Sequence, residues 1–233
     1  MVELDQFKYT LNGYEQPLKE VRDSLDLENK EQRVEELERE MEAPDFWDDA
    51  ERSQKMMKEL TVFTPTYNRA YTLGRLYESL CRQSNKNFEW LVVDDGSKDG
   101  TEELIKSWQS EEKISIRYIY QENGGKMRAH NRGVKSTETE LFVCVDSDDY
   151  LVDDGIEKIL SFWKEKGGDA TIAGLVGYRG KNTEETLSDG KFPYERNSTL
   201  KELYKNGFRG DSTLVYRTEV LRSFLFPEIE GEK

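Results

Sequence analysis

The chain has 233 residues and a formal net charge of −14, from 48 Asp and Glu against 34 Lys and Arg. This acidic balance excludes a protein that binds nucleic acid through bulk positive charge, so we expect no nucleic-acid partner. The longest apolar runs, Leu91–Val93 and Leu141–Val145, are too short to cross a bilayer, and two cysteines make no disulfide framework. We expect a cytoplasmic protein, and a peripheral position on the inner face of the membrane is left open.

The charge and the glycines divide the chain near residue 60. Residues 1–60 hold 18 acidic and 9 basic side chains, a net charge of −9, whereas the remaining 173 residues have a net charge of −5. Gly13 is the only glycine before residue 60, and the other 16 follow it. Such a shift in composition is typical of a domain boundary, so we expect one domain over residues 1–60 and a second over residues 61–233.

The first of these domains is predicted to be helical. Residues 24–41 are rich in Glu, Leu, Arg and Lys and contain no Gly or Pro, and apolar side chains such as Val34 and Leu37 recur at helical spacing. Pro44 is placed to end this helix and to open a second one over residues 45–60. The pattern predicts a helical hairpin or short coiled coil, through which the chain could self-associate.

Three segments of this domain carry a resemblance to a known family. Ser24–Leu27, Arg33–Glu38 and Pro44–Asp49 resemble the start of the N-terminal helical domain of bacterial peptide chain release factor 2. The chain contains neither the Gly-Gly-Gln tripeptide that a release factor needs for peptidyl-tRNA hydrolysis nor a Ser-Pro-Phe-type tripeptide for codon reading. We therefore expect residues 1–60 to be a helical leader that does not release peptides.

From residue 61 onward, strand-like runs alternate with amphipathic helical ones. Alternation at this spacing predicts βαβ units, and hence an α/β fold in which helices cover both faces of a mostly parallel sheet. The expected strands cover residues 61–64, 88–93, 114–120, 141–145 and 170–176, and the expected helices cover residues 72–81, 102–108, 126–134 and 155–164.

Polar residues follow each of the first four expected strands. In open α/β sheets, ligands bind beyond the carboxyl ends of the strands, so these segments form one candidate site. Taken singly, Asp94–Ser97 is equally consistent with a turn or helix cap, and Gly124-Gly125 with a loop that needs positive φ. The four segments cover residues 65–69, 94–101, 122–126 and 146–149.

Three acids, Asp146, Asp148 and Asp149, follow the apolar strand expected at residues 141–145. Carboxylates this close repel one another unless a cation is present. Alternate acids on an extended segment can face one hard divalent ion, whose remaining positions phosphate oxygens and water fill. The alternative interpretation is a solvated acidic turn.

Taken together, the motifs resemble those of family 2 glycosyltransferases with the GT-A fold. They are Thr64–Arg69, Val92–Thr101, Asn123–Lys126 with the Asn-x-Gly at residues 131–133, and Asp146–Asp149. The resemblance covers residues 61–233. It implies an inverting enzyme that moves a sugar from a nucleotide-diphosphate donor, expected to be a UDP-sugar, to a glycan, lipid or other hydroxyl acceptor.

For the nucleotide, the resemblance implies four residues of this sequence. Thr66 and Arg69 match the loop that contacts the nucleotide. Asp95 matches the acid that accepts a hydrogen bond from the base, and Asp94 lies beside it.

For the diphosphate, the resemblance implies a second group. Lys126 and Arg128 match a loop and helix that face the donor, where a diphosphate favours positive charge. Asp146 and Asp148 match the Asp-x-Asp motif, which holds Mg²⁺ or Mn²⁺ against the diphosphate, and Asp149 is expected to share that role. A metal ion there stabilises the charge that develops on the leaving nucleotide.

The acceptor hydroxyl needs a carboxylate base, which in the family follows late in the chain. The candidates are Glu228, Glu230 and Glu232, and Glu232 is preferred because its Gly-Glu-Lys setting best resembles the family's motif. The sequence stops at Lys233, so we expect the domain to lack part of its acceptor side, and transfer to be weak or absent.

Two other functions are left open. One is a non-catalytic fold that binds a nucleotide sugar and associates through its helical segment. The other is a translation-factor fragment, which only residues 1–60 support. The abrupt change near Leu60 is consistent with an engineered fusion, an aberrant gene model or a natural fusion of two unrelated segments.

Overall fold

The computed structural model describes residues 58–167, 169–181, 185, 187, 197–209 and 211–228, together with Tyr14 and Arg39. The chain divides into two compact units, Met1–Met56 and Met57–Lys233. Apart from Arg39, the helix expected over residues 24–41 lies outside the described residues, as do residues 45–57 of the second expected helix and the segments that resemble release factor 2. The end of that second helix was predicted wrongly, because Lys58 and Glu59 lie in no helix and Leu60 begins the first strand of the sheet. The domain boundary at residue 60 stays a prediction.

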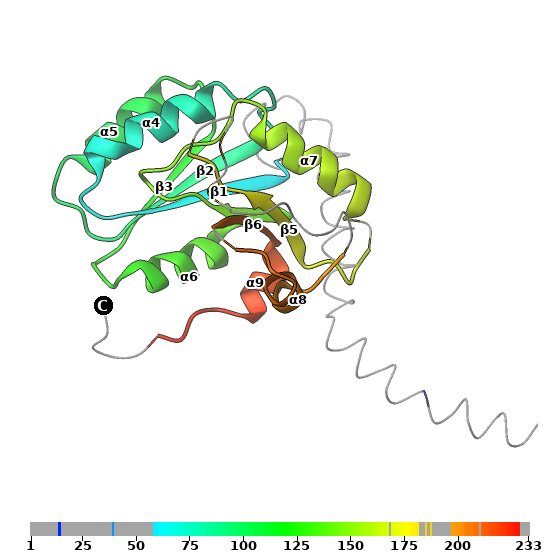
Figure 1. Cartoon of the computed structure of the whole chain (residues 1–233). Coiled ribbons are helices and arrows are strands. Elements are labelled where there is room, and N and C mark those ends of the chain that lie inside the picture. Colours follow the sequence, from blue (N-terminus) through cyan, green and yellow to red (C-terminus); the bar gives the residue numbers. More distant parts are fainter. Residues whose placement is uncertain are drawn as a thin grey trace, which may run out of the picture. The chain divides into compact units, whose positions relative to one another are not determined.

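The second unit is built around one sheet of alternating strands and helices (Figure 1). In chain order its elements are β1 (Leu60–Thr66), α4 (Ala70–Cys81), β2 (Phe88–Asp94), α5 (Thr101–Ser110), β3 (Ile116–Tyr120), α6 (Lys126–Ser136), β4 (Leu141–Cys144), α7 (Gly155–Lys166), β5 (Gly174–Tyr178), α8 (Leu200–Lys205), β6 (Ser212–Arg217) and α9 (Thr218–Ser223). None of the described helices is long and apolar enough to cross a membrane.

The six strands lie in the order β3-β2-β1-β4-β6-β5. Strands β3, β2, β1 and β4 are parallel, whereas β6 runs antiparallel to both β4 and β5. The predicted α/β fold with a mostly parallel sheet is therefore confirmed. The chain leaves β1 toward β2 and later returns to β4 on the other side of β1, so the β1–β4 junction is the point where the strand order reverses.

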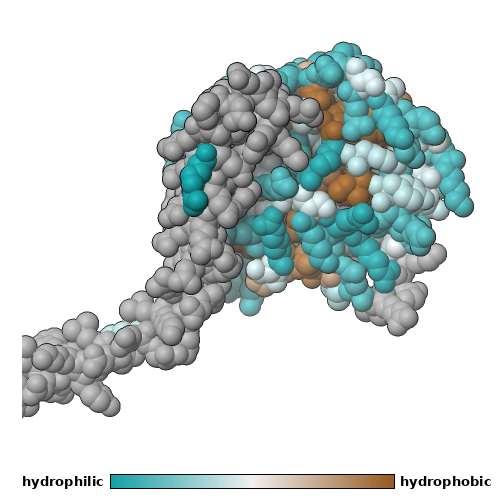
Figure 2. Space-filling model, turned by 180° about the vertical axis from the view of Figure 1, so that it is seen from behind, coloured by the Kyte–Doolittle hydropathy of each residue, from teal (hydrophilic) through white to brown (hydrophobic). Residues whose placement is uncertain are grey.

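Helices cover both faces of the sheet, with α4, α5 and α7 on one side and α6 and α9 on the other (Figure 1). Side chains alternate between the two faces along each strand: Val62 and Trp90 belong to the first core, and Phe63 and Leu91 to the second. The whole of β2 is buried, as expected of a central parallel strand covered on both faces. Seen from behind, the described surface is mostly hydrophilic with small hydrophobic patches (Figure 2).

Two parts of the sheet differ from the sequence prediction. Strand β5 begins at Gly174 and not at residue 170, because Asp169 closes a turn there: its carboxylate accepts hydrogen bonds from the amide and hydroxyl of Thr171, at 2.8 and 2.6 Å. Strand β6 and helices α8 and α9 were not predicted. Each of these elements is six residues long and mixes polar with apolar side chains, so its sequence gives no clear period of two or of 3.6.

The packing of α6 on the sheet depends on a glycine in the middle of the helix. A Cβ atom on Gly133 would lie 2.4 Å from Cε2 of Phe63, a fully buried side chain of β1. Glycine weakens a helix interior by about 1 kcal/mol relative to alanine, so its presence here needs a packing reason. The close approach of α6 to β1 supplies that reason, and it brings the start of α6 to the carboxyl ends of β1 and β4.

Candidate functional site

At the end of β2, Asp94 is buried and closes a turn. Its Oδ1 atom accepts a hydrogen bond from the amide of Ser97 at 2.8 Å, and its Oδ2 atom accepts one from the hydroxyl of Tyr118 at 2.7 Å. Burial, together with this hydrogen bond, raises the pKa of Tyr118 above its ordinary value. One oxygen of Asp94 thus closes the turn after β2, and the other ties the end of β2 to the neighbouring strand β3.

The next residue, Asp95, organises the loop that leads into α6. Its Oδ1 accepts hydrogen bonds from Gln121 Nε2 at 2.6 Å and the Gly124 amide at 2.9 Å. Its Oδ2 accepts from Asn123 Nδ2 at 3.2 Å and the Gly125 amide at 2.7 Å. Four donors occupy the four lone-pair positions of a carboxylate. A base N–H must replace one of them to bind Asp95, so the base-binding role stays a prediction.

Thr66, predicted to contact the nucleotide, is the last residue of β1, and that role stays a prediction. Its carbonyl accepts a hydrogen bond from the amide of Asp95 at 2.8 Å. Its hydroxyl is buried and has no hydrogen-bond partner among the described residues. Because buried polar atoms are nearly always paired, an orphan hydroxyl at this strand end is compatible with a polar ligand.

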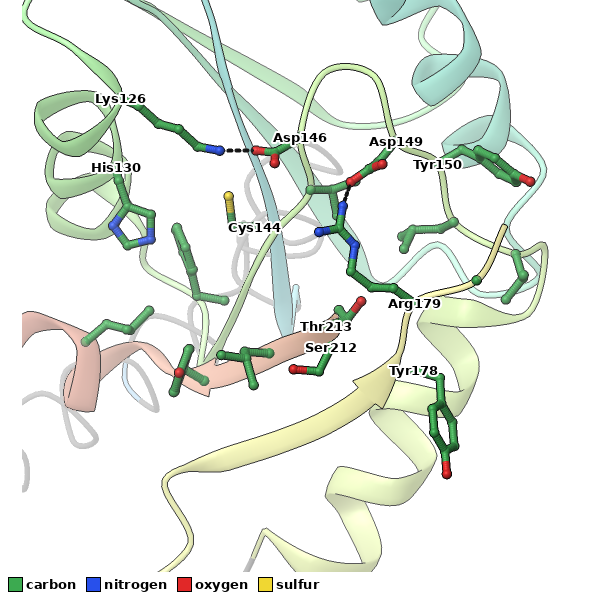
Figure 3. Close-up of a pocket in the computed structure, with 18 of the residues that line it drawn as sticks. Lys126, His130, Cys144, Asp146, Asp149, Tyr150, Tyr178, Arg179, Ser212 and Thr213 are labelled. Atoms are coloured by element: carbon green, nitrogen blue, oxygen red, sulfur yellow. Dashed lines mark hydrogen bonds and ion pairs between the residues drawn. The ribbon is translucent and has the colours of Figure 1, made fainter. Parts of the chain in front are cut away.

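The acidic segment after β4 forms a turn and not the extended run expected, since the Asp149 amide donates to the Asp146 carbonyl at 3.0 Å. Each of its three acids faces a different cation, and Figure 3 shows the pairs of Asp146 and Asp149. Lys126 from α6 lies 2.7 Å from Asp146, and Arg179 from the end of β5 forms an ion pair with Asp149. The third pair, between Asp148 and Arg69, has an N–O distance of 3.5 Å.

No group of three His, Cys, Asp or Glu side chains in the part of the chain that the structure describes is arranged to hold a metal ion. The cations just named direct the three carboxylates apart. Mg²⁺ is usually bound by only one or two carboxylates together with substrate phosphates, and its ligands are oxygens. Asp146 and Asp148 offer such oxygens at the β1–β4 junction, so the residues fit a metal ion that arrives with a diphosphate.

The two basic residues predicted to face the donor point to different places. Lys126 reaches Asp146 and lines a pocket of about 750 Å³. Arg128 folds back on the loop before α6, where its Nη1 atom donates to the Gly124 carbonyl at 2.9 Å, and it lines a separate pocket of about 450 Å³. The structure therefore brings Lys126, but not Arg128, to the acidic segment.

The larger pocket lies between the acidic segment, β6, α6 and the chain after α9, and its volume is in the range of small-molecule sites. One part of its wall is polar and charged, and another part is apolar. The polar part includes Lys126, Asp146, Asp149, Arg179, Ser212 and Thr213, and the apolar part includes Phe142, Val220, Leu221, Phe224 and Phe226.

His130 lines the same pocket and is the only histidine of the chain. Its ring makes edge contacts with Phe63, Phe142 and Phe226, with centroid distances of 5.5, 5.5 and 5.1 Å. Burial lowers the pKa of His130, and the charge of Lys126 lowers it further. The imidazole is therefore neutral at pH 7 and packs among these three aromatic rings.

Of the three candidate bases, only Glu228 lies in the described part of the chain; Glu230 and Glu232 lie outside it. The Oε1 atom of Glu228 accepts a hydrogen bond from Asn131 Nδ2 at 2.8 Å, which is the main cause that lowers the pKa of this carboxyl. Glu228 lines the smaller pocket and not the one that holds Asp146. Which of the three carboxylates serves as the base stays a prediction.

Sequence reasoning missed Arg179, Ser212 and Thr213. Arg179 directly follows β5, so the rule that located the other strand ends finds it once the strand is placed at residues 174–178. Ser212 and Thr213 begin β6, an antiparallel strand that the alternation of βαβ units does not predict. The sequence also indicated the Asn-x-Gly motif at residues 131–133 without predicting what Asn131 binds. Its partners, Phe226 and Glu228, lie 95 and 97 residues away.

Comparison with known proteins gives consistent matches. The sequence model of glycosyl transferase family 2 matches residues 61–225. Poly(ribitol-phosphate) beta-N-acetylglucosaminyltransferase TarS of Staphylococcus aureus is 26% identical over 176 residues, which cover 74% of this chain and 30% of TarS. The putative teichuronic acid biosynthesis glycosyltransferase TuaG of Bacillus subtilis is 27% identical over 171 residues, covering 73% of this chain and 66% of TuaG.

A solved structure agrees with these matches. The crystal structure of S. aureus TarS 1–349 in complex with UDP-GlcNAc superposes with a TM-score of 0.57 at 25% identity, covering 72% of this chain and 48% of that chain. This chain thus spans about 30% of the full TarS sequence and about half of this crystallised fragment.

Proposed function

Because the chain belongs to glycosyl transferase family 2, we propose that it transfers a sugar from a nucleotide-diphosphate donor to an acceptor hydroxyl, with a divalent metal ion and inversion at the anomeric carbon. One observation carries the proposal. The carboxyl ends of β1, β2 and β4 bring Thr66, Asp95 and Asp146 to one edge of the sheet. This is the edge where open α/β sheets bind their ligands.

The donor we propose is a UDP-sugar. The TarS structure was solved as a complex with UDP-GlcNAc, and the chain resembles it over most of the family domain. Two features at this strand end support the proposal. The Thr66 hydroxyl has no hydrogen-bond partner among the described residues, and Asp95 holds the neighbouring Gly124–Gly125 loop in place. Arg69, Asp94 and Arg128 complete the nucleotide-contacting set that we propose from the family's motifs.

We propose that Mn²⁺ or Mg²⁺ is held by Asp146 and Asp148, with Asp149 beside them. The ion supplies neutralisation of the charge that builds on the leaving diphosphate. This chain's own cations take part as well. Lys126 forms an ion pair with Asp146, and Arg69 forms one with Asp148. Both are long, solvent-accessible side chains that can rotate to contact phosphate oxygens.

The acceptor side is proposed to be the pocket of about 750 Å³, which contains Asp146 and Asp149 and extends to β6 and Phe226. It suits a glycan, lipid or other hydroxyl acceptor that presents one polar and one apolar face. The general base is proposed to be Glu232, because Glu228 is engaged by Asn131 on α6. Residues 1–60 are proposed as a separate helical domain that mediates self-association.

Calorimetry tests the donor and metal together. UDP is titrated into the full chain with and without Mn²⁺, and the same is done with the double variant Asp146→Ala/Asp148→Ala. We expect metal-dependent binding by the wild type and a loss of about tenfold or more in affinity, about 1.4 kcal/mol, in the variant. The variant Glu102→Ala/Glu103→Ala, which removes two exposed acids from α5, is the matched control and retains binding.

Two outcomes separate the remaining alternatives. Wild-type protein that binds no nucleotide diphosphate with Mn²⁺ contradicts the proposed function. Protein that binds UDP with Mn²⁺ and releases no UDP from UDP-GlcNAc, with water or any hydroxyl acceptor, is a nucleotide-sugar-binding module and not a transferase.

A further inference from the structure

Asn131, in the middle of α6, holds a distant segment of the chain by three hydrogen bonds. Its Nδ2 atom donates to the Phe226 carbonyl at 2.9 Å and to Glu228 Oε1 at 2.8 Å, and its Oδ1 atom accepts from the Phe226 amide at 2.9 Å. The side chain is 1% exposed. One amide thus pairs with both backbone groups of Phe226, as a neighbouring strand would.

The segment held in this way, residues 224–228, follows α9 and forms no helix or strand of its own. Within the described residues, its backbone hydrogen bonds run from Phe224 to Leu221 and between Phe226 and Asn131. Without Asn131, the two backbone groups of Phe226 would depend on water. The amide therefore fixes where this segment lies against α6.

This segment is also a wall of the larger pocket. Phe224 and Phe226 line it, although Phe224 is 77% exposed and Phe226 45% exposed. The ring of Phe226 meets that of His130 with the centroids 5.1 Å apart and the planes at 78°. Another part of the pocket wall is charged. Exposed apolar side chains such as Phe224 and Phe226 are therefore suited to contact the apolar face of a ligand that also has polar groups.

The same helix reaches the acidic segment with its first residue, Lys126, five positions before Asn131. Helix α6 therefore contacts the proposed metal acids at one end and the segment 224–228 at its middle. Gly133, the other member of the Asn-x-Gly motif, allows α6 to lie directly on Phe63. Gly133 thus determines how closely α6 packs on the sheet, and Asn131 determines where residues 224–228 lie against α6.

We propose that Asn131 is a positioning residue for sugar transfer, which holds residues 224–228 as the acceptor-side wall of the pocket. The inference rests on the proposed function, because an acceptor side exists only if the chain is a transferase. Asparagine suits this position because it both donates and accepts. Aspartate lacks the donors and adds a negative charge beside Glu228, and leucine has neither donor nor acceptor.

The single histidine provides a test that is independent of activity. In wild-type protein, NMR of the His130 imidazole reports its contact with Phe226, and titration reports its lowered pKa. In Asn131→Leu we expect the imidazole resonances to shift and the pKa to rise toward 6.5, because Phe226 moves away. Thr137→Val is the matched control: it removes a buried hydrogen bond to Gly133 from the end of the same helix, and it leaves the His130 resonances in place.

Turnover provides the second test. With UDP-GlcNAc and Mg²⁺ as probes, we expect kcat for UDP release by Asn131→Leu to fall about tenfold, about 1.4 kcal/mol, with the KM for UDP-GlcNAc and the Kd for UDP within about twofold of wild type. Unfolding of part of the sample would also lower the apparent kcat and leave KM and Kd unchanged, so kcat is expressed per folded molecule, counted by the stoichiometry of UDP binding in calorimetry.

Three results would overturn the inference. They are unchanged His130 resonances in Asn131→Leu, shifted resonances with unchanged kcat, and a loss of UDP affinity as large as the loss of kcat. Failure of the proposed function is seen separately, as a wild-type protein that binds no UDP; the His130 spectrum then still decides whether Asn131 holds the segment.

Discussion

The Nζ atom of Lys126 lies 2.7 Å from Oδ1 of Asp146, so the first residue of α6 neutralises an acid at the end of β4. The two side chains are 64% and 35% exposed, and an ion pair this accessible contributes little to stability. Its consequence is for ligands. A metal ion at Asp146 competes with the ammonium group, whereas a diphosphate that arrives with the metal ion gives the ammonium group a new partner.

The first prediction follows from this exchange, in which Lys126 leaves Asp146 for the diphosphate when a metal ion binds. Lys126→Met should bind Mn²⁺ alone more tightly than wild type and should bind UDP in the presence of Mn²⁺ more weakly. One unit charge a few ångströms away near a protein surface changes binding by roughly 1–2 kcal/mol, so we expect about a five- to thirtyfold change in each direction. Calorimetry with Mn²⁺ alone and with UDP plus Mn²⁺ measures the two effects.

Lys106→Met is the control for this prediction, because it removes the same charge from an exposed i,i+4 pair on α5. It should leave both affinities as in wild type. If Lys126→Met changes the two affinities in the same direction, Lys126 acts only through the net charge of the site, and the exchange of partners is refuted.

The sequence was sufficient to predict the four parallel strands and the acids that follow β2 and β4, because Leu91–Val93 and Leu141–Val145 are apolar runs that end abruptly in aspartates. The antiparallel strand β6 was missed, since its period is obscured by two polar residues: Arg217, which donates to the Ile172 carbonyl, and Ser212, which lines the pocket.

The partners of the site residues could not be predicted at all. Asp95 is bound by donors 26 to 30 residues away, and Asn131 by groups 95 and 97 residues away. Both are short polar side chains whose sequence neighbourhood is equally suited to a turn or a helix surface. What decides their role is tertiary burial, which leaves each of them only protein partners to satisfy its hydrogen bonds.

The second prediction concerns Asp95. Asp95→Asn replaces one carboxylate oxygen by an NH₂ group that faces two donors, so at least one amide of the Gly124–Gly125 loop loses its acceptor. A buried unsatisfied donor costs roughly 1–3 kcal/mol. We expect a lower free energy of unfolding and faster hydrogen exchange of the Gly124 and Gly125 amides, measured by urea denaturation and NMR. Exchange as slow as in wild type would show that Asp95 does not hold the loop.

The third prediction concerns Gly133. Gly133→Ala adds a Cβ atom 2.4 Å from the buried ring of Phe63, and overpacking of this kind costs roughly 1–3 kcal/mol. This exceeds the gain of about 1 kcal/mol in helix propensity, so we expect a net loss in the free energy of unfolding. Gly74→Ala in α4 is the control, because nothing lies within 4 Å of its added Cβ, and it should stabilise the protein. Equal effects of the two substitutions would contradict the close packing of α6.

The fourth prediction is a dependence of stability on pH that comes from His130. Burial holds the pKa of His130 below its ordinary value of 6.5, so between the lowered value and 6.5 the unfolded chain binds more protons than the folded one. The free energy of unfolding therefore has its full His130 contribution above pH 6.5, where the imidazole is neutral in both states. That contribution is lost as the pH falls from 6.5 through the lowered pKa of the folded protein. Because the chain has one histidine, His130→Phe should remove that slope while the ring still packs against Phe142 and Phe226. Urea denaturation between pH 5 and pH 7.5 measures it, and a slope that persists in His130→Phe would assign it to other groups.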